Sequence, residues 1–284
     1  MNSGEAADLA IFVLCLALFI LYNVLYYFSS ALSKLTPDAL HIYKSAEILW
    51  STGKKARSVW ADRMMHSSSE SLLAVHTVRN LLISVAWFAA ADSALIVQML
   101  NILTDPASIA QIEQYSLTDP ITHGDSFMSV PVKISLSLST LFISLLLFVQ
   151  SARMAVHLGF LVRVVPENLN TSIPFRETTV VLTQRMNFQF SVGVRMLFAF
   201  VPLTFYAMLG TLALLISTLV LLTLMLFLDV VPSTNPGLEW LMRTHNQSVE
   251  EASIDLRAGG AASDVSFQSR RMGSLGSQSR RDEL

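Results

Sequence analysis

The chain has 284 residues, of which 52% are hydrophobic and only 14% are charged, and its net charge is −2. Soluble domains usually carry about 25% charged residues, so this composition excludes an ordinary soluble domain. The apolar residues are collected into long uncharged runs, which indicates a multi-pass membrane protein.

The first apolar run, Leu9–Phe28, contains no charged residue. A bilayer core about 30 Å thick needs about 20 apolar helical residues, and lipid requires spanning segments to be helices or closed barrels. Because strand-like alternation is absent, the run predicts a spanning helix. Met1–Ala7 has no basic residue, so we expect a retained anchor and not a signal peptide. The single cysteine, Cys15, lies in this run, so no intrachain disulfide is possible.

The middle of the chain predicts helices both inside and outside the bilayer. Asp38–Met65 mixes aromatic residues with Lys and Arg, and we expect helical segments here, broken at Gly53, on the membrane surface or against the bundle. Ser71–Leu103 and Pro131–Val165 each predict one helix that crosses the membrane and also projects into the cytosol. The loop between them, Thr104–Ser129, is expected to be irregular.

The last apolar run, Met196–Leu228, has no charged residue and would extend about 50 Å as a helix. That length exceeds one upright crossing and is too short for two crossings and a turn. We predict one long helix that is kinked near Pro202 and Gly210. The alternative is a tight hairpin, which would place the C-terminus in the cytosol.

The charges of the loops predict the orientation of the chain. Lys and Arg are concentrated in the loops after the first and third runs, whereas the loop after the second run is acidic. Basic loops stay cytosolic, so four crossings would leave both termini on the outer or lumenal side. The predicted fold is an all-α bundle of about four transmembrane helices over residues 1–229, with cytosolic helical extensions. Residues 230–284 have too little apolar surface to form a core and are expected to be a disordered tail.

Two motifs in the tail fit a lumenal C-terminus. The chain ends in Arg281, Asp282, Glu283 and Leu284, which resembles the endoplasmic-reticulum retrieval signals Lys-Asp-Glu-Leu and His-Asp-Glu-Leu. Asn246 begins an Asn-Gln-Ser glycosylation acceptor. Together they predict residence in the endoplasmic reticulum. In the alternative, a cytosolic tail would carry phosphorylation sites at serines beside arginines.

Polar residues recur at the predicted cytoplasmic ends of three runs. Arg side chains at headgroup level grip phosphate bidentately, so these residues could hold an anionic lipid or a phosphorylated metabolite. The alternative is that they are interfacial anchors and interhelical hydrogen bonds. The candidate residues are His76, Arg79 and Asn80 in Ser71–Leu103, Gln150, Arg153 and His157 in Pro131–Val165, and Arg195 just before Met196–Leu228.

Asp92 lies near the middle of the membrane crossing predicted within Ser71–Leu103. An ionisable group at such a depth is costly and normally faces the bundle or a wet cavity. One hypothesis makes it a relay for protons or cations. The other makes it a neutral, buried carboxyl that is hydrogen-bonded to Ser93 or to a neighbouring helix.

Patterns that would indicate catalysis are missing from the sequence. The six histidines form no HxxxH or HExxH pair, and no phosphate loop, GxGxxG, CxxC or Gly-x-Ser-x-Gly motif is present. The tail arginines lack the interleaved aromatic residues of a nucleic-acid-binding segment. We therefore expect no metal, no cofactor and no nucleic-acid partner, and nothing in the sequence indicates an enzyme.

Several segments share a pattern with a known family. They are Trp60–Met65, Leu73–Asn80, Val149–Arg153 with His157 and Phe160, Gly193–Arg195 with Phe198 and Pro202, and Leu228–Asp229. In combination they resemble domain of unknown function 599, in its plant and algal form. The resemblance covers Asp8–Asp229 and implies a multi-pass membrane protein with no assigned activity. Asp92 departs from the family pattern, and the tail is additional.

These features predict a binding function. We expect a non-enzymatic bundle that engages anionic lipid or partner proteins at the cytosolic interface, and a bundle of this size often forms homo-oligomers. The alternative is a transporter or channel for a small solute or ion. A continuous polar path from Asp92 to Arg153 and Arg195 would favour transport, whereas a dry, tightly packed centre would favour binding.

Overall fold

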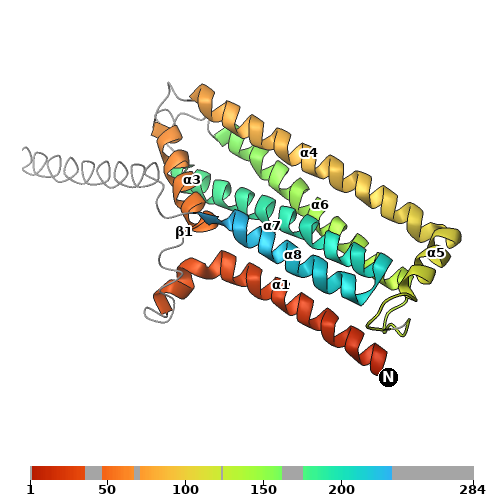
Figure 1. Cartoon of the computed structure of the whole chain (residues 1–284). Coiled ribbons are helices and arrows are strands. Elements are labelled where there is room, and N and C mark those ends of the chain that lie inside the picture. The colour runs from red at the N-terminus through yellow and green to blue at the C-terminus, as the bar shows by residue number, and fades with distance from the viewer. Residues whose placement is uncertain (1, 36–46, 67–70, 123, 162–174, 232–284) are drawn as a thin grey trace, which may run out of the picture. The chain divides into compact units, whose positions relative to one another are not determined.

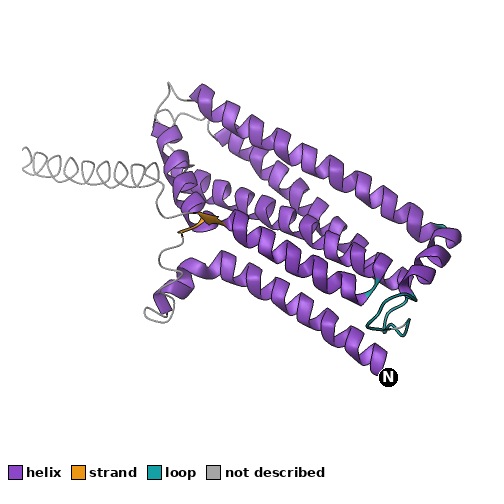
Figure 2. Cartoon of the chain, in the orientation of Figure 1, coloured by secondary structure: helices purple, strands orange, loops and turns teal. Residues whose placement is uncertain are grey.

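The computed structural model describes residues 2–35, 47–66, 71–122, 124–161 and 175–231, and Met1–Val231 form one compact unit. The described residues contain helices and one pair of two-residue strands (Figure 1 and Figure 2). The helices are α1 Ser3–Leu35, α3 Leu49–His66, α4 Ser71–Thr104, α5 Pro106–Ser116, α6 Val130–Leu161, α7 Phe175–Leu209 and α8 Thr211–Asp229; the strands are β1 Glu47–Ile48 and β2 Val230–Val231. This confirms the predicted all-α membrane bundle.

α6 and α7 form the centre of the bundle. α4 packs against α6, and α8 packs against α7, with α1 beyond α8 (Figure 1). α6 carries fully buried serines at seven-residue intervals, Ser137, Ser144 and Ser151. Small residues at such positions let helices approach closely in a membrane. The Ser144 hydroxyl donates to the Gly193 carbonyl of α7 at 2.9 Å. The Ser151 hydroxyl likewise donates to the Met186 carbonyl at 3.1 Å.

α1 has 33 residues, and three further helices are likewise longer than the bilayer is thick. α4, α6 and α7 have 34, 32 and 35 residues, or about 50 Å each, against about 30 Å for the hydrocarbon core. Their surplus length continues the packing beside α3: Ala74, Leu158 and Met186 form a buried cluster, with Trp60 packed against it. The predicted helical extensions are therefore present. We call this end of the unit, where α3, β1 and β2 lie (Figure 1), the inner end.

The last apolar run is two helices and not one kinked helix. α7 begins at Phe175, well before the run, and the chain reverses at Gly210, which has a φ of +93°. The kinked-helix prediction is wrong and the hairpin alternative is correct, which gives five candidate spans instead of four. The apolar run is shorter than the two crossings because α7 also uses polar residues to cross, and several of these are buried: Thr179, Thr183 and Arg195, which is only 6% exposed. Pro202 lies within α7 and does not end it.

The hairpin changes where the chain leaves the bundle. α8 ends at the inner end, where β2 pairs antiparallel with β1, whereas α1 begins at the opposite end (Figure 1). The start of α1 and the exit from α8 therefore lie at opposite ends of the bundle, which contradicts the prediction of one shared side for the two termini; the C-terminus itself lies outside the described residues. If the basic first loop is cytosolic, as its charges predict, the exit from α8 is also cytosolic and out of reach of a lumenal receptor or glycosyltransferase. Residence in the endoplasmic reticulum thus loses its support, and residues 281–284 and Asn246 lie outside the described residues.

Two loop predictions also need correction. Gly53 lies within α3 and does not break it. The loop between α4 and α6, which we call the outer loop, is partly helical. Its helix α5 begins directly after Asp105, whose carboxylate accepts the backbone N–H groups of Ala107 and Ser108 at 3.2 Å each. Pro106 at the first helical position suits a helix start, since its missing N–H would have no helical partner there.

Candidate binding site at the inner end

Arg195 of α7 is the centre of a polar cluster at the inner end. Its guanidinium forms an ion pair with Asp229, the last residue of α8, and donates to Asn23 Oδ1 of α1 at 3.2 Å. The same group lies 3.6 Å from the centroid of the Tyr26 ring, within the range of a cation–π contact. Asp229 also accepts a hydrogen bond from the Tyr22 hydroxyl at 2.6 Å. One buried charge pair therefore joins α1, α7 and α8.

The α1 side of this cluster follows from helical spacing. Tyr22 and Tyr26 are four residues apart, as are Asn23 and Tyr27, so all four lie on neighbouring positions of one helix face. On that face the Tyr27 hydroxyl lies 2.9 Å from the Ser191 hydroxyl of α7. The spacing thus brings a polar aromatic stripe of α1 against α7.

α3 supplies an aromatic and a basic residue to the same site. The Trp50 ring packs at 5.1 Å from Tyr27 and 5.9 Å from Phe188, and the Arg57 guanidinium lies 5.1 Å over the Trp50 ring. The Nε of Arg57 is buried and has no hydrogen-bond partner among the described residues. Burial lowers the pKa of Arg57 from its ordinary value, and the nearby Tyr26 opposes this to a smaller extent. Arg57 therefore brings a partly desolvated cation to the site.

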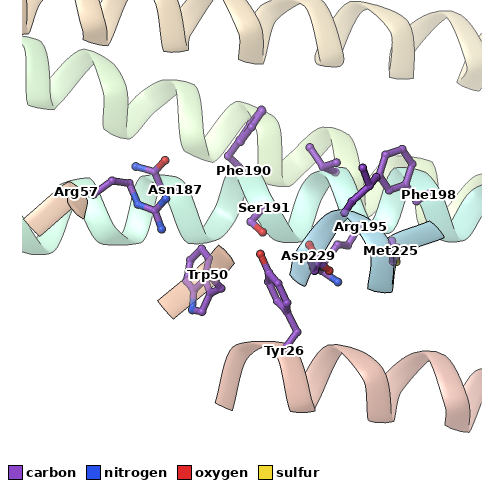
Figure 3. Close-up of a pocket in the computed structure, with 12 residues that line it drawn as sticks. Tyr26, Trp50, Arg57, Asn187, Phe190, Ser191, Arg195, Phe198, Met225 and Asp229 are labelled. Carbon is purple, nitrogen blue, oxygen red and sulfur yellow. The ribbon is translucent and has the colours of Figure 1, made fainter. Parts of the chain in front are cut away.

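Side chains of α1, α3, α7 and α8 line a pocket of about 300 Å³, a volume at the lower end of the range for ligand sites. Figure 3 shows Arg57 and Asn187 at one end of the pocket and Phe198 and Met225 at the other. The Arg195 ion pair lies between these two ends (Figure 3). The pocket thus has Arg57 and Asn187 at one end and apolar side chains at the other, with the charge pair between them.

Comparison with known proteins places the chain in a family. The family described as Protein of unknown function, DUF599, matches residues 10–234, which include every residue that lines the pocket. The chain belongs to the DUF599 family. The predicted resemblance is thereby confirmed. No curated protein and no solved structure matches the chain.

The structure of this DUF599 protein separates Arg195 from the other candidate residues. Arg195 is buried against α1 and α8, whereas the other six are exposed on α4 and α6 and do not line the pocket. Their opposite faces carry the packing residues, such as Val78 and Ala155. The exposed residues are His76, Arg79, Asn80, Gln150, Arg153 and His157.

Asp92 of α4 is fully buried, and neither of its carboxyl oxygens has a hydrogen-bond partner in the described part of the chain. Ser93 does not serve it, because the Ser93 hydroxyl donates to the Ala89 carbonyl of its own helix at 2.8 Å. Ser144 of α6 is close enough to influence the carboxyl, but its hydroxyl donates to Gly193. Of the two expected partners, only a neighbouring helix therefore offers a polar group.

Apolar side chains flank Asp92 in both directions along the bundle. Towards the inner end, Phe88, Phe148 and Phe190 form an aromatic cluster with ring centroids 5.6 to 5.9 Å apart. Towards the outer end lies a buried core that includes Ile96 and Leu141. The inner-end pocket does not include Asp92.

A second polar cluster, which was not predicted, closes the outer end. Asp8 of α1 is fully buried, and its carboxylate accepts four hydrogen bonds of 2.5 to 3.1 Å. The donors are the hydroxyls of Ser126, Tyr206 and Thr211 and the backbone N–H of Phe127. The cluster ties α1 to the outer loop and to the turn between α7 and α8.

Asp119 of the outer loop holds the same turn. Its carboxylate accepts the Thr211 backbone N–H at 2.7 Å and the Thr122 hydroxyl at 3.1 Å. Burial raises the pKa of Asp119, but its hydrogen bonds outweigh burial, so the pKa lies below its ordinary value. A depressed folded-state pKa gives stability that is complete above the unfolded pKa of about 4 and is lost as pH falls through the folded pKa.

We therefore expect the thermal midpoint of the detergent-solubilised protein to fall below about pH 4, and to fall less steeply in Asp119→Asn. Fluorescence-detected unfolding at several pH values measures this. Asp125→Asn, at an exposed position of the same loop, should keep the wild-type profile. An Asp119→Asn profile as steep as that of the wild type would show that Asp119 does not contribute.

Sequence reasoning identified Arg195 but missed its partners. The signal on α1 was the pair of four-residue spacings that joins Tyr22 to Tyr26 and Asn23 to Tyr27 inside an uncharged run. The signal for Asp229 was its place as the first charge after the last apolar run. No comparable signal marked Trp50 or Arg57, because their role depends on how α3 packs against α7.

Proposed function

We propose that this DUF599 protein is a non-enzymatic membrane component that binds an anionic group in its inner-end pocket. The observation that carries the proposal is Arg57, which lines the pocket with a buried Nε that has no described partner. Among the lining residues, Arg57 and Arg195 bring two positive charges and Asp229 brings one negative charge. A bound anion would supply the missing acceptor and the missing counter-charge in one charge-assisted contact.

The centre of the bundle supports binding over transport. A solute path that uses Asp92 would have to pass the apolar and aromatic side chains that flank that residue in both directions. The charged groups of the pocket lie at one end of the bundle and are not continuous with Asp92. The pocket, and not the set of six exposed polar residues on α4 and α6, is therefore the site that we expect to engage lipid or a partner protein.

Arg57→Gln should weaken the binding of an anionic phospholipid at least about tenfold, because a hydrogen bond to a charged group contributes about 1.5–3 kcal/mol. The measurement is a titration of the full-length protein, in a neutral detergent, with phosphatidylglycerol followed by native mass spectrometry. Phosphatidylcholine, which has no net charge, should bind more weakly to the wild type and should be insensitive to the substitution.

Lys54→Gln is the matched control for this experiment. Lys54 lies on α3, one turn from Arg57, but is exposed and does not line the pocket. The control removes the same charge and should leave phosphatidylglycerol binding unchanged. If the two variants lose affinity equally, general surface charge explains the binding. If Arg57→Gln binds like the wild type, the proposed function is wrong.

A further inference from the structure

The two ends of the pocket lie at different depths along α7. Asn187 at its polar end and Phe198 at its apolar end are eleven residues apart on α7, which corresponds to about 16 Å along a helix. α7 runs from the inner end towards the outer end, so Phe198 lies deeper in the spanning part of the bundle than Asn187. The polar half of the pocket therefore lies nearer the inner surface than the apolar half.

The apolar half is continuous with the outside of the bundle. Phe198 and Leu228 line the pocket, yet they are 36% and 55% exposed. Both belong to helices that are candidate membrane spans, so their exposed surfaces are accessible to lipid. Met225, which also lines the pocket, is buried at 4% exposure. An acyl chain that has passed the Arg195–Asp229 ion pair can therefore extend from this end of the pocket into the surrounding lipid.

We infer that the ligand is a membrane lipid with one negative charge, bound with its phosphate beside Arg57 and the first part of an acyl chain between Phe198 and Met225. This inference rests on the proposed function. The lining residues leave one positive charge uncompensated, which matches a phosphodiester headgroup. A soluble phosphate compound or an acidic peptide would occupy the polar half and leave the apolar half unfilled.

The experiment compares three ligands on the full-length protein in neutral detergent. Phosphatidylglycerol is the lipid, glycerophosphoglycerol is the same headgroup without acyl chains, and a short acidic peptide represents a protein partner. We expect the lipid to bind at least about 100-fold more tightly than either soluble ligand, because burying several methylenes adds about 0.8 kcal/mol each. Arg57→Gln should weaken the lipid and the headgroup by the same factor.

A pair of variants on α8 tests the acyl half. Leu228→Gln should weaken the lipid about threefold to tenfold and leave glycerophosphoglycerol unchanged. The matched control is Phe227→Gln, since Phe227 is 81% exposed on the same helix and does not line the pocket. It should leave both ligands unchanged.

The outcomes separate this inference from the proposed function. If glycerophosphoglycerol or the peptide binds the wild type as tightly as the lipid and depends on Arg57, the lipid assignment is overturned and the binding function stands. If the Arg57→Gln substitution changes the affinity for none of the ligands, both the lipid assignment and the proposed function are wrong. The comparison of ligands on the wild type decides the question even where Leu228→Gln does not fold.

Discussion

Arg195→Gln is expected to lower the free energy of unfolding by about 3–5 kcal/mol, because removal of one partner from a buried ion pair leaves the other charge uncompensated. The remaining charge, Asp229, is at the C-terminal end of α8, where the helix dipole adds to the cost of a negative charge. The substitution also removes the contacts of Arg195 with Asn23 and Tyr26. Unfolding of the purified protein in mixed micelles of increasing SDS content measures the change.

Two comparisons isolate the charge pair. Arg185→Gln changes the same residue type on α7 at an exposed position and should alter the free energy of unfolding by less than about 0.5 kcal/mol. The double variant Arg195→Gln/Asp229→Asn should be more stable than Arg195→Gln alone, because it leaves no unpaired charge. Equal destabilisation by Arg195→Gln and Arg185→Gln would show that the ion pair does not hold the helices together.

Gly210→Ala is the second substitution with a large expected effect. A β-carbon at position 210 would lie 2.6 Å from Asp119 Oδ2, the oxygen that accepts the Thr211 backbone N–H. The φ of +93° also favours glycine strongly. Strain of this kind costs about 1–3 kcal/mol, and loss of the hydrogen bond adds to it. We expect a lower free energy of unfolding in the same SDS titration.

The control for this substitution is Gly159→Ala on α6. A β-carbon there would meet its nearest neighbour, Val78, at an ordinary 3.9 Å, and alanine favours a helix interior by about 0.5–1 kcal/mol over glycine. Gly159→Ala should therefore be neutral or stabilising. A Gly210→Ala protein as stable as the wild type would mean that the chain does not reverse sharply at that residue.

The spanning helices were predictable where a continuous apolar run of the sequence is itself enough to require a helix in lipid. Runs such as Leu9–Phe28 must be helical in lipid wherever they pack, and the extensions of α4 and α6 follow from helical patterns that continue past the apolar runs. The hairpin at Gly210 was not predictable from run length. A crossing that contains Arg195 is tolerated only because Asn23, 172 residues away, and Asp229 satisfy the guanidinium.

The site was predictable only in part for the same reason. Helical spacing identified polar positions on α4 and α6, but spacing alone does not say whether a face meets a helix or the solvent. Arg153 and its neighbours lie on the exposed face. Arg57 became a pocket residue through the packing of α3 on α7 and its contact with Trp50, which a single sequence does not reveal.

The inner-end pocket requires a chain that crosses five times, so that the start of α1 and the end of α8 lie on opposite sides of the membrane. Labelling of engineered cysteines with an impermeant maleimide tests this directly in sealed vesicles, in a Cys15→Ala background that leaves no other thiol. Ser233→Cys should react from the same side as Lys54→Cys, and Ser3→Cys should react only after the vesicles are permeabilised. Reaction of Ser3→Cys and Ser233→Cys from one side would contradict the hairpin and the position of the inner-end pocket.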